Sequence, residues 1–308
     1  MEKILISGTS GFIGSEIHNT LLKQNKLIIK NIDLRIKQKD IIRLINNDSF
    51  DVYIHAAGIH PYRDEFSNKE LFLKNKVILK KIKKILTNSK KIILISSFIN
   101  LINYENKETN EKNKLRIYKE DNYYKKSKYL TEKYFLKLSK KFKKELIILY
   151  PCHVIGPNDW KLSPNGKFLL NMRKRKIKFF FDIHYPITDV REISSYVSYI
   201  LKKNLISHKK LIINGDIEMK EYINKLMQNN NFLFLRLSKY FYLSLSIINK
   251  ILIKIKILNK DYFPISTYRY LKLNPKTNSI IKNNYKNNYF VDETIFDTLA
   301  FFKKNGKF

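Results

Sequence analysis

The sequence predicts an α/β protein with a doubly wound, mostly parallel central sheet and a smaller C-terminal lobe. Two patterns support this class. Short apolar runs alternate with longer amphipathic runs, and a glycine triplet joins the first apolar run to the first amphipathic one. Such alternation is typical of strand–helix–strand units, which build parallel sheets. The apolar runs are continuous, as expected for strands that are covered on both faces.

The expected elements follow the chain in order. Runs rich in Ile, Leu, Val and Tyr predict strands at 3–7, 27–32, 51–55, 91–96 and 146–150. Longer amphipathic runs between them predict helices at 13–24, 40–46, 68–86 and 125–142. The stretch 103–122 is polar and poor in apolar residues, which predicts a long surface loop.

Composition excludes several classes of protein. The chain has 308 residues, 44% of them hydrophobic, so it is long enough for a sizeable core and is not of disordered composition. Its single cysteine, Cys152, excludes an intrachain disulfide and favours a reducing compartment. Because the chain opens on a strand-like run without a signal-peptide pattern, a cytoplasmic location is expected. The histidines show no metal-ligand spacing, so no metal site is expected.

The formal net charge is +33, from 60 Lys plus Arg against 27 Asp plus Glu. Lys, Asn, Ile, Phe and Tyr are all abundant, and their codons are rich in A and T. Lys-Lys pairs are spread along the whole chain rather than gathered in one arm. We therefore interpret the charge as a coding bias expressed at the surface. A nucleic-acid partner, which needs a basic patch on one face, is not expected.

The most apolar segment is 232–258. Five basic residues interrupt it, and its longest uncharged stretch, 240–249, is far shorter than the roughly 20 residues that a membrane-spanning helix needs. No transmembrane segment is therefore expected. A helix packed on the core is the favoured interpretation, and a helix that lies on a membrane surface is the alternative.

Gly8, Gly11 and Gly14 form a GxxGxxG loop between the first strand and the first helix. Glycines at this position permit a tight turn and let backbone N–H groups approach a pyrophosphate. The start of the following helix offers unpaired donors and a favourable dipole. Three of only eight glycines in the chain stand here. The motif predicts a Rossmann-type dinucleotide-binding fold.

Further motifs follow this loop in order. The chain reads HAAG at 55–58, SS at 96–97, YKKSK at 124–128, PCHVIGP at 151–157 and TDVRE at 188–192. Together with the glycine loop, these motifs resemble those of the extended short-chain dehydrogenase/reductase family, also called the NAD-dependent epimerase/dehydratase family. The resemblance covers nearly the whole chain. It is nearest to the members similar to dihydroflavonol reductase and 3β-hydroxysteroid dehydrogenase.

The resemblance implies a catalytic set. Tyr124 would be the acid–base group, and Lys128, one helical turn later on the same face, would lower the pKa of its phenol and bind the nicotinamide ribose. Ser97 would hold the substrate oxygen, with Ser96 as the near alternative. Asn75 would help to hold a water molecule that relays the proton.

The resemblance also implies NAD as the cofactor, with NADP as the alternative. Asp33 stands where an acid binds the adenosine ribose, which favours NAD, whereas Arg35 would instead meet a 2′-phosphate and favour NADP. The residues expected at the cofactor are Gly8, Ser10, Gly11, Phe12, Ile13, Gly14, Asp33, His55, Ala56, Ala57, Tyr124, Lys128, Pro151 and Val154.

Two parts of the chain are expected to have different tasks. Residues 1–157 would form the NAD(P)-binding domain, to which 188–215 would return. Residues 158–187 and 216–308 would form the substrate lobe. In the resembled family, nucleotide-sugar enzymes carry an Arg shortly before the DVRD-like element. Segment 181–187 has none, and Arg173 and Arg175 are candidates upstream.

Three functions stay open. The favoured one is an NAD(P)-dependent oxidoreductase that transfers hydride at a secondary alcohol or ketone of a small molecule. The second is a nucleotide-sugar epimerase or dehydratase with tightly bound NAD. The third is a dinucleotide-binding protein without turnover. The resemblance also implies a homodimer, formed through the helices at 68–86 and 125–142.

Overall fold

Six parallel strands form the central sheet of the computed structural model, which describes residues 1–24, 26–45, 48–59, 68–119, 121–227, 233–258, 262–281 and 284–308. Every neighbouring pair in this sheet is parallel. From one edge to the other, the strands are β10 (Lys209–Ile212), β6 (Glu145–Pro151), β4 (Ser89–Ile95), β3 (Phe50–His55), β1 (Glu2–Ser7) and β2 (Leu27–Ile32). The expected doubly wound sheet is confirmed.

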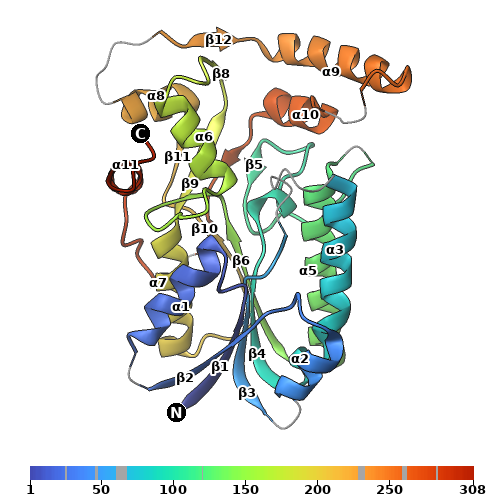
Figure 1. Ribbon diagram of the computed structural model, residues 1–308, viewed down its shortest axis with the longest axis vertical. Helices are drawn as coiled ribbons and strands as arrows, with labels where there is room; N and C mark the ends of the chain where they lie inside the picture. Colours follow the sequence, from blue (N-terminus) through green and yellow to red (C-terminus); the bar gives the residue numbers. More distant parts are fainter. Residues whose placement is uncertain are drawn as a thin grey trace.

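Helices cover both faces of this sheet (Figure 1). On one face, α1 (Phe12–Leu22) packs beside α7 (Val190–Lys203). On the other, α3 (Asn68–Lys81) packs beside α5 (Tyr123–Lys141), with α2 (Gln38–Ile45) and α4 (Lys83–Thr87) near the same face. Successive residues of β1 point to opposite faces, so Ile4 and Ile6 enter one core cluster and Leu5 the other.

The expected helices are present with small differences. The run at 68–86 is divided into α3 and α4 rather than continuous. The helix expected at 40–46 is α2, and residue 46 lies outside the described residues. In the part of the chain that the structure describes, no helix is both long and apolar enough to cross a membrane.

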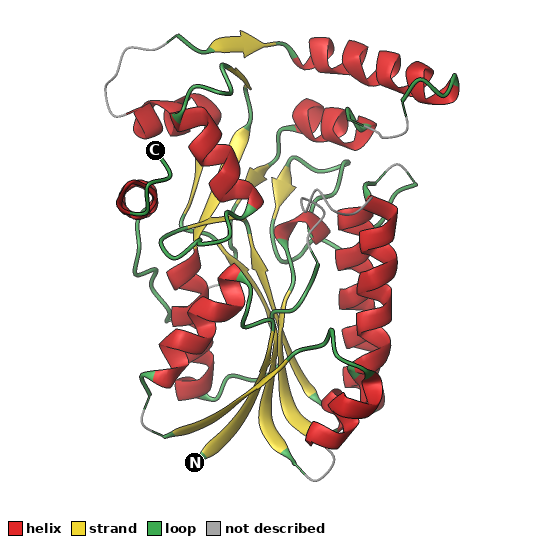
Figure 2. Ribbon diagram, in the orientation of Figure 1, coloured by secondary structure: helices red, strands yellow, loops and turns green. Residues whose placement is uncertain are grey.

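A second group of elements lies beyond the carboxyl ends of the sheet strands (Figure 2). β9 (His184–Asp189) lies between β7 (His153–Ile155) and β11 (Gly215–Glu218). Two further pairs are β8 (Phe179–Phe181) with β12 (Leu235–Leu237), and β5 (Glu108–Thr109) with β13 (Lys276–Thr277). The remaining elements are the short 3₁₀ helix η1 (Phe98–Asn100), α6 (Pro164–Arg173), α8 (Met219–Met227), α9 (Lys239–Lys254), α10 (Ile265–Leu273) and α11 (Val291–Lys304).

The polar stretch 103–122 is not the plain surface loop that the sequence predicts. Residue 120 lies outside the described residues, and Glu111 is buried. Its carboxylate accepts hydrogen bonds from the backbone N–H of Leu211 (2.9 Å) and Ile280 (3.0 Å) and from the hydroxyl of Ser279 (2.6 Å). A buried carboxylate needs such donors, and they come from chain segments at least 100 residues away. Local polarity therefore misleads here.

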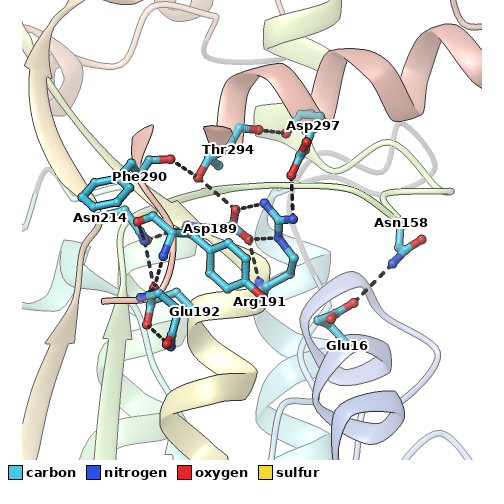
Figure 3. Close-up of polar contacts among 12 residues, drawn as sticks. Glu16, Asn158, Asp189, Arg191, Glu192, Asn214, Phe290, Thr294 and Asp297 are labelled. Atoms are coloured by element: carbon cyan, nitrogen blue, oxygen red, sulfur yellow. Dashed lines mark hydrogen bonds and ion pairs between the residues drawn. The ribbon is translucent and has the colours of Figure 1, made fainter. Parts of the chain in front are cut away.

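The TDVRE motif fixes the C-terminal helix α11 to the end of β9 (Figure 3). The buried carboxylate of Asp189 accepts hydrogen bonds from the Nε (3.0 Å) and Nη2 (2.7 Å) atoms of Arg191 and from the hydroxyl of Thr294 (2.9 Å). Arg191 also donates to Asp297 at 2.6 Å and lies over the ring of Tyr289. The motif thus acts as a structural clamp.

Replacing Arg191 by Ala is expected to lower the free energy of unfolding by about 3 kcal/mol, because it leaves the buried Asp189 carboxylate without its cation. The melting temperature should then fall by several degrees. Thermal unfolding checks this, with Arg43→Ala on α2 as the control, because Arg43 is exposed. Equal melting temperatures for the two variants would show that the clamp contributes little to stability.

Candidate active site

The glycine loop is packed against the chain that leaves β3. Gly8 has φ +88°, and a Cβ atom there would lie 2.6 Å from the backbone of Ala56 and Ala57. A Cβ on Gly14 would lie 2.1 Å from the carbonyl oxygen of Gly8. The backbone N–H of Ala56 donates to the carbonyl oxygen of Ser7 at 3.1 Å. Only glycine fits at these two positions, and the loop is brought next to the HAAG motif.

The start of α1 is left open for an anion. Gly11 is the N-cap and supplies no side-chain cap, and the first turn, which includes Phe12 and Ile13, carries no acidic residue. The carbonyl of the neighbouring Ser10 accepts a hydrogen bond from the Lys161 ammonium at 2.8 Å, which brings a positive charge to the rim of the loop. Uncapped N–H groups, the helix dipole and this lysine suit a pyrophosphate, so the loop fits a dinucleotide.

Asp33 directly follows β2, and the pairing of Ile32 with Ser7 places it beside the glycine loop. Its carboxylate accepts hydrogen bonds from the backbone N–H (2.9 Å), Nε (2.9 Å) and Nη2 (2.7 Å) of Arg35. These bonds lower the pKa of Asp33. The two side chains that favour different cofactors are therefore paired with each other.

His55 ends β3 inside the core, 2% exposed. Its Nδ1 atom lies 2.7 Å from the Tyr53 hydroxyl and 3.1 Å from the Ser7 hydroxyl. Burial, and to a smaller extent the positive charge of Lys128, lower the pKa of His55 to about 3. The imidazole is therefore neutral at physiological pH, and Lys128 lies within electrostatic range of this strand end.

Acid is expected to destabilise the protein through His55. The histidine pKa rises from about 3 in the fold to its ordinary value near 6.5 when the chain unfolds. The unfolded state therefore binds the proton first, and stability is lost as pH falls below about 6.5. At pH 4.5 the loss from this group is about 3 kcal/mol. Urea unfolding between pH 7.5 and 4.5 checks this, with His55→Asn as the comparison. Identical pH slopes would remove His55 as the cause.

Helix α5 begins at Tyr123, and the side chain of its N-cap residue, Asn122, accepts a hydrogen bond from the backbone N–H of Lys125 at 2.9 Å. Tyr124 lies in the first turn and Lys128 one turn later, at the spacing that puts both on one face. Lys128 is partly buried, and burial lowers the pKa of its ammonium group to about 8 against the opposing charge of Glu132. A desolvated lysine beside the end of a strand is typical of functional sites.

The two neighbouring lysine–tyrosine arrangements have other roles. Lys125 is buried and pairs with Asp121 at 3.3 Å, below the ring of Tyr104. Tyr129 and Lys133 form a second YxxxK match, but the Lys133 ammonium lies 5.7 Å from the centre of the Tyr129 ring of the same helix. The contacts of Lys125 are structural, and those of Lys133 are local.

Ser96 and Ser97 directly follow β4 and lie in different environments. The Ser96 hydroxyl donates to the buried Glu132 carboxylate at 2.9 Å. Ser97 is the N-cap of η1, and its oxygen receives one long contact, 3.5 Å, from the backbone N–H of Ile99. Helix α5 packs against η1, so Ser97 lies next to the helix that carries Tyr124. Of the two serines, Ser97 is the one not engaged with Glu132.

Glu132 is a buried residue beside the candidate site that the sequence motifs do not indicate. Besides Ser96, its carboxylate accepts hydrogen bonds from the amide of Asn100 (2.8 Å) and the hydroxyl of Tyr150 (2.5 Å). Burial and the adjacent carboxylate raise the pKa of Tyr150, which keeps its hydroxyl protonated as a donor. Glu132 lies four residues after Lys128, on the same face of the helix. This spacing was the one feature of the sequence that could have indicated a buried carboxylate here.

Asn75 lies on α3 and holds the chain that leaves β3. Its side-chain oxygen accepts a hydrogen bond from the backbone N–H of Ile59 (2.9 Å), and its amide donates to the carbonyl of Ile59 (2.9 Å). The side chain is thus engaged with the backbone just after the HAAG motif. The proton-relay water expected beside Asn75 stays a prediction.

Pro151 and Val154 lie where β6 passes into β7, and an aromatic cluster follows from this turn. His153 stacks on Tyr185 with ring centres 4.1 Å apart and lies 5.1 Å from the ring of Phe98, the residue after Ser97. Tyr185 also contacts Tyr222 at 4.8 Å. Aromatic rings therefore pack next to the serine end of β4.

Of the two upstream arginines, Arg173 has its described contacts outside this cluster of rings. Arg173 donates to the carbonyl of Met227 at 3.2 Å and faces the ring of Phe308, and Arg175 follows α6 with φ +57°. A cavity of about 520 Å³ between β8, β12, α9 and α10 is lined by Arg236, Lys239 and Lys272, among others. None of its lining residues belongs to the expected site.

The glycine loop, the open start of α1 and the lysine on α5 define a Rossmann-type dinucleotide-dependent enzyme. The chain matches the model of the NAD dependent epimerase/dehydratase family over residues 4–178, and it belongs to this family. The expected family is confirmed, and with it an NAD-dependent enzyme. No curated protein matches the chain.

Solved structures share the fold across the whole chain. Gox2253 is 17% identical, with a TM-score of 0.81, and the match covers 100% of this chain and 99% of that one. UDP-glucuronic acid 4-epimerase from Bacillus cereus, in complex with NAD, is 15% identical with a TM-score of 0.72, over 98% and 99% of the two chains. dTDP-glucose 4,6-dehydratase from Bacillus anthracis, in complex with NAD, is 12% identical with a TM-score of 0.66, over 99% and 97%.

Proposed function

We propose that this chain is an NAD-dependent oxidoreductase that acts at a secondary alcohol or ketone of a small molecule. The observation that carries the proposal is Lys128. It lies one helical turn after Tyr124, within electrostatic range of the strand end at His55, and burial lowers its pKa to about 8. Ser97 stands at the end of the neighbouring strand, β4, where its hydroxyl is not bound by Glu132.

Each residue has a defined task. NAD, when bound, supplies the hydride acceptor, and NADH the donor. The Tyr124 hydroxyl gives a proton to the substrate oxygen in reduction and takes it back in oxidation. The Lys128 ammonium stabilises the phenolate that remains. Ser97 donates a hydrogen bond to the substrate oxygen, where negative charge develops. Asn75 keeps the chain after His55 in place.

The surroundings of the site support a small or lipophilic substrate. The rings of His153, Tyr185 and Phe98 pack together beside Ser97, so the neighbourhood of this serine is apolar. Segment 181–187 contains no arginine, and Arg173 is held by the carbonyl of Met227. A nucleotide sugar would need cations for its phosphates, whereas a carbonyl compound of moderate size would not.

A nucleotide-sugar epimerase or dehydratase is the second candidate. It is supported by the family and by neighbours such as the UDP-glucuronic acid 4-epimerase and the dTDP-glucose 4,6-dehydratase. The same Ser97, Tyr124 and Lys128 would serve it. NAD would then stay bound through the cycle and be reduced and reoxidised in place.

One experiment separates the two. The purified protein is denatured, and any released nicotinamide nucleotide is identified and quantified. A protein free of nucleotide that binds added NADH, and that oxidises it with a panel of ketones, supports the oxidoreductase. Stoichiometric bound NAD, with conversion of a UDP- or dTDP-sugar and no net NADH use, would replace it by the second candidate.

Asp33 is expected to set the preference for NAD, because a carboxylate accepts hydrogen bonds from the ribose hydroxyls and repels a 2′-phosphate. Asp33→Asn should weaken NADH binding by about tenfold and leave NADPH binding unchanged or stronger. Fluorescence titration measures both, with Asp40→Asn on α2 as the control. If the wild-type protein bound NADPH more tightly than NADH, Arg35 rather than Asp33 would set the cofactor preference.

A cytoplasmic location and a homodimer stay predictions. The dimer would use α3 and α5, which lie side by side on one face of the sheet. Leu73 and Val77 on α3 and Leu136 on α5 are exposed apolar residues that such a contact would cover. Sedimentation of the purified chain tests it.

A further inference from the structure

Helix α9 carries an apolar face that the described part of the chain leaves uncovered. One side of the helix is buried: Tyr242 packs against Phe181 and Phe263, and Ser246 and Asn249 follow on the same side. The other side is between 50% and 63% exposed, and it consists of Tyr240, Phe241, Ile247, Ile248, Ile251 and Ile255. Tyr240, Ile247, Ile251 and Ile255 follow one another at spacings of seven, four and four residues, which puts them on one stripe, and Phe241 and Ile248 flank it. Scattered exposed apolar residues are ordinary, but a continuous stripe indicates a contact surface.

The stripe lies at an outer end of the molecule. Figure 1 shows α9 and β12 along the end opposite the N-terminus, outside α10. The flanks extend the apolar surface, since Leu235 before the helix and Ile257 after it are 62% and 66% exposed.

The charges beside the stripe have one sign. Segment 233–258 contains Arg236, Lys239, Lys250, Lys254 and Lys256, and no Asp or Glu. Arg236 forms an ion pair with Asp182, which directly follows β8. Lys250, Lys254 and Lys256 are exposed. An apolar stripe bordered by lysines is the pattern of helices that lie in the interface of an anionic membrane. The chain's net charge of +33 adds to the attraction.

We propose that α9 and its flanks bind an anionic lipid surface, with the isoleucine stripe among the acyl chains near the headgroups and the lysines on the lipid phosphates. The helix lies on the surface rather than across it, because its 16 residues span about 24 Å, short of the roughly 30 Å hydrocarbon layer. A second copy of the chain fits less well, since pairing two such faces would bring like-charged lysine rows together.

The test uses the full chain and vesicles of phosphatidylcholine, alone or with about one third phosphatidylglycerol. Binding is expected only to the anionic vesicles and should weaken at about 0.5 M salt. The double variants Ile247→Asn with Ile251→Asn, and Lys250→Glu with Lys254→Glu, should each lose at least about tenfold in vesicle affinity. All four positions are exposed, so the fold should persist, and unchanged NADH binding and melting temperature verify this.

Matched variants separate a specific face from general adsorption by a basic protein. Leu44→Asn on α2 alters an equally exposed apolar residue, and Lys202→Glu with Lys203→Glu alters two exposed lysines at the end of α7. Both should bind vesicles like the wild type. Equal losses in these controls, or no loss in the α9 variants, would overturn the proposal. So would a dimer in sedimentation that the isoleucine variant dissociates, without vesicle binding by the wild type.

Discussion

Replacement of Tyr124 by Phe is expected to lower kcat by about a thousandfold while the Kd for NADH changes by less than about twofold. The substitution removes the only proton donor proposed at the substrate oxygen and leaves the ring in place. The loss should therefore fall on the chemical step. Turnover is measured with the substrate that the ketone or nucleotide-sugar panel identifies, and binding by NADH fluorescence.

Tyr129→Phe is the matched control for this experiment. Tyr129 lies on the same helix and begins the second YxxxK match, with Lys133 beside its own ring. It should keep full activity. If Tyr124→Phe retained more than a tenth of the wild-type kcat, Tyr124 would not be the acid–base group. If Tyr129→Phe lowered kcat as much as Tyr124→Phe, the assignment of Tyr124 and Lys128 as the catalytic pair would be wrong.

Replacement of Glu132 by Ala should lower the free energy of unfolding by about 3–5 kcal/mol. The buried carboxylate accepts hydrogen bonds from Ser96, Asn100 and Tyr150. Its removal leaves three donors in the core without their acceptor. The effect should exceed that of deleting a surface carboxylate several times over. Urea unfolding at pH 7.5 measures the loss of stability. Glu105→Ala is the control, because Glu105 is exposed.

Glu132→Gln distinguishes charge from hydrogen bonding. The neutral amide keeps one acceptor oxygen, so stability should lie between that of the wild type and Glu132→Ala. The charge of Glu132 raises the pKa of Lys128, which lies near 8. Loss of the Glu132 charge should therefore lower the pKa of Lys128. The pH at which activity falls on the alkaline side should shift to lower pH by the same amount. An unchanged pH profile would mean that Glu132 supports the fold alone.

Strand and helix positions around the cofactor could be predicted from the sequence because their causes are local. Continuous apolar runs require burial on both faces, and β1, β3 and β4 satisfy this in one sheet. The glycine loop follows from sterics: a Cβ on Gly8 or Gly14 would collide with neighbouring backbone atoms. Spacing alone also puts Tyr124 and Lys128 on one face of α5.

Residues whose role depends on distant partners could not be predicted. Glu132 looks like one more charge in a lysine-rich helix, and only the meeting of α5 with β4 and β6 shows its three donors. The two serines at the end of β4 differ in the same way, since Ser96 is bound by Glu132. Asp189 and Arg191 matched a family motif, but the contact with α11 that explains them is more than 100 residues away.

The burial of Glu111 has a consequence for the order in which the protein assembles. Its carboxylate is satisfied only when three donors are in place. These are the backbone N–H groups of Leu211, which lies in β10, and of Ile280, and the hydroxyl of Ser279 near the end of the chain. During synthesis, most of the sheet strands emerge from the ribosome well before these partners. The segment between Ser97 and Tyr124 therefore cannot reach its final packing until the last tenth of the chain is made. Contacts of such long range also slow folding. The nascent chain should thus acquire a sheet first and a working active site last.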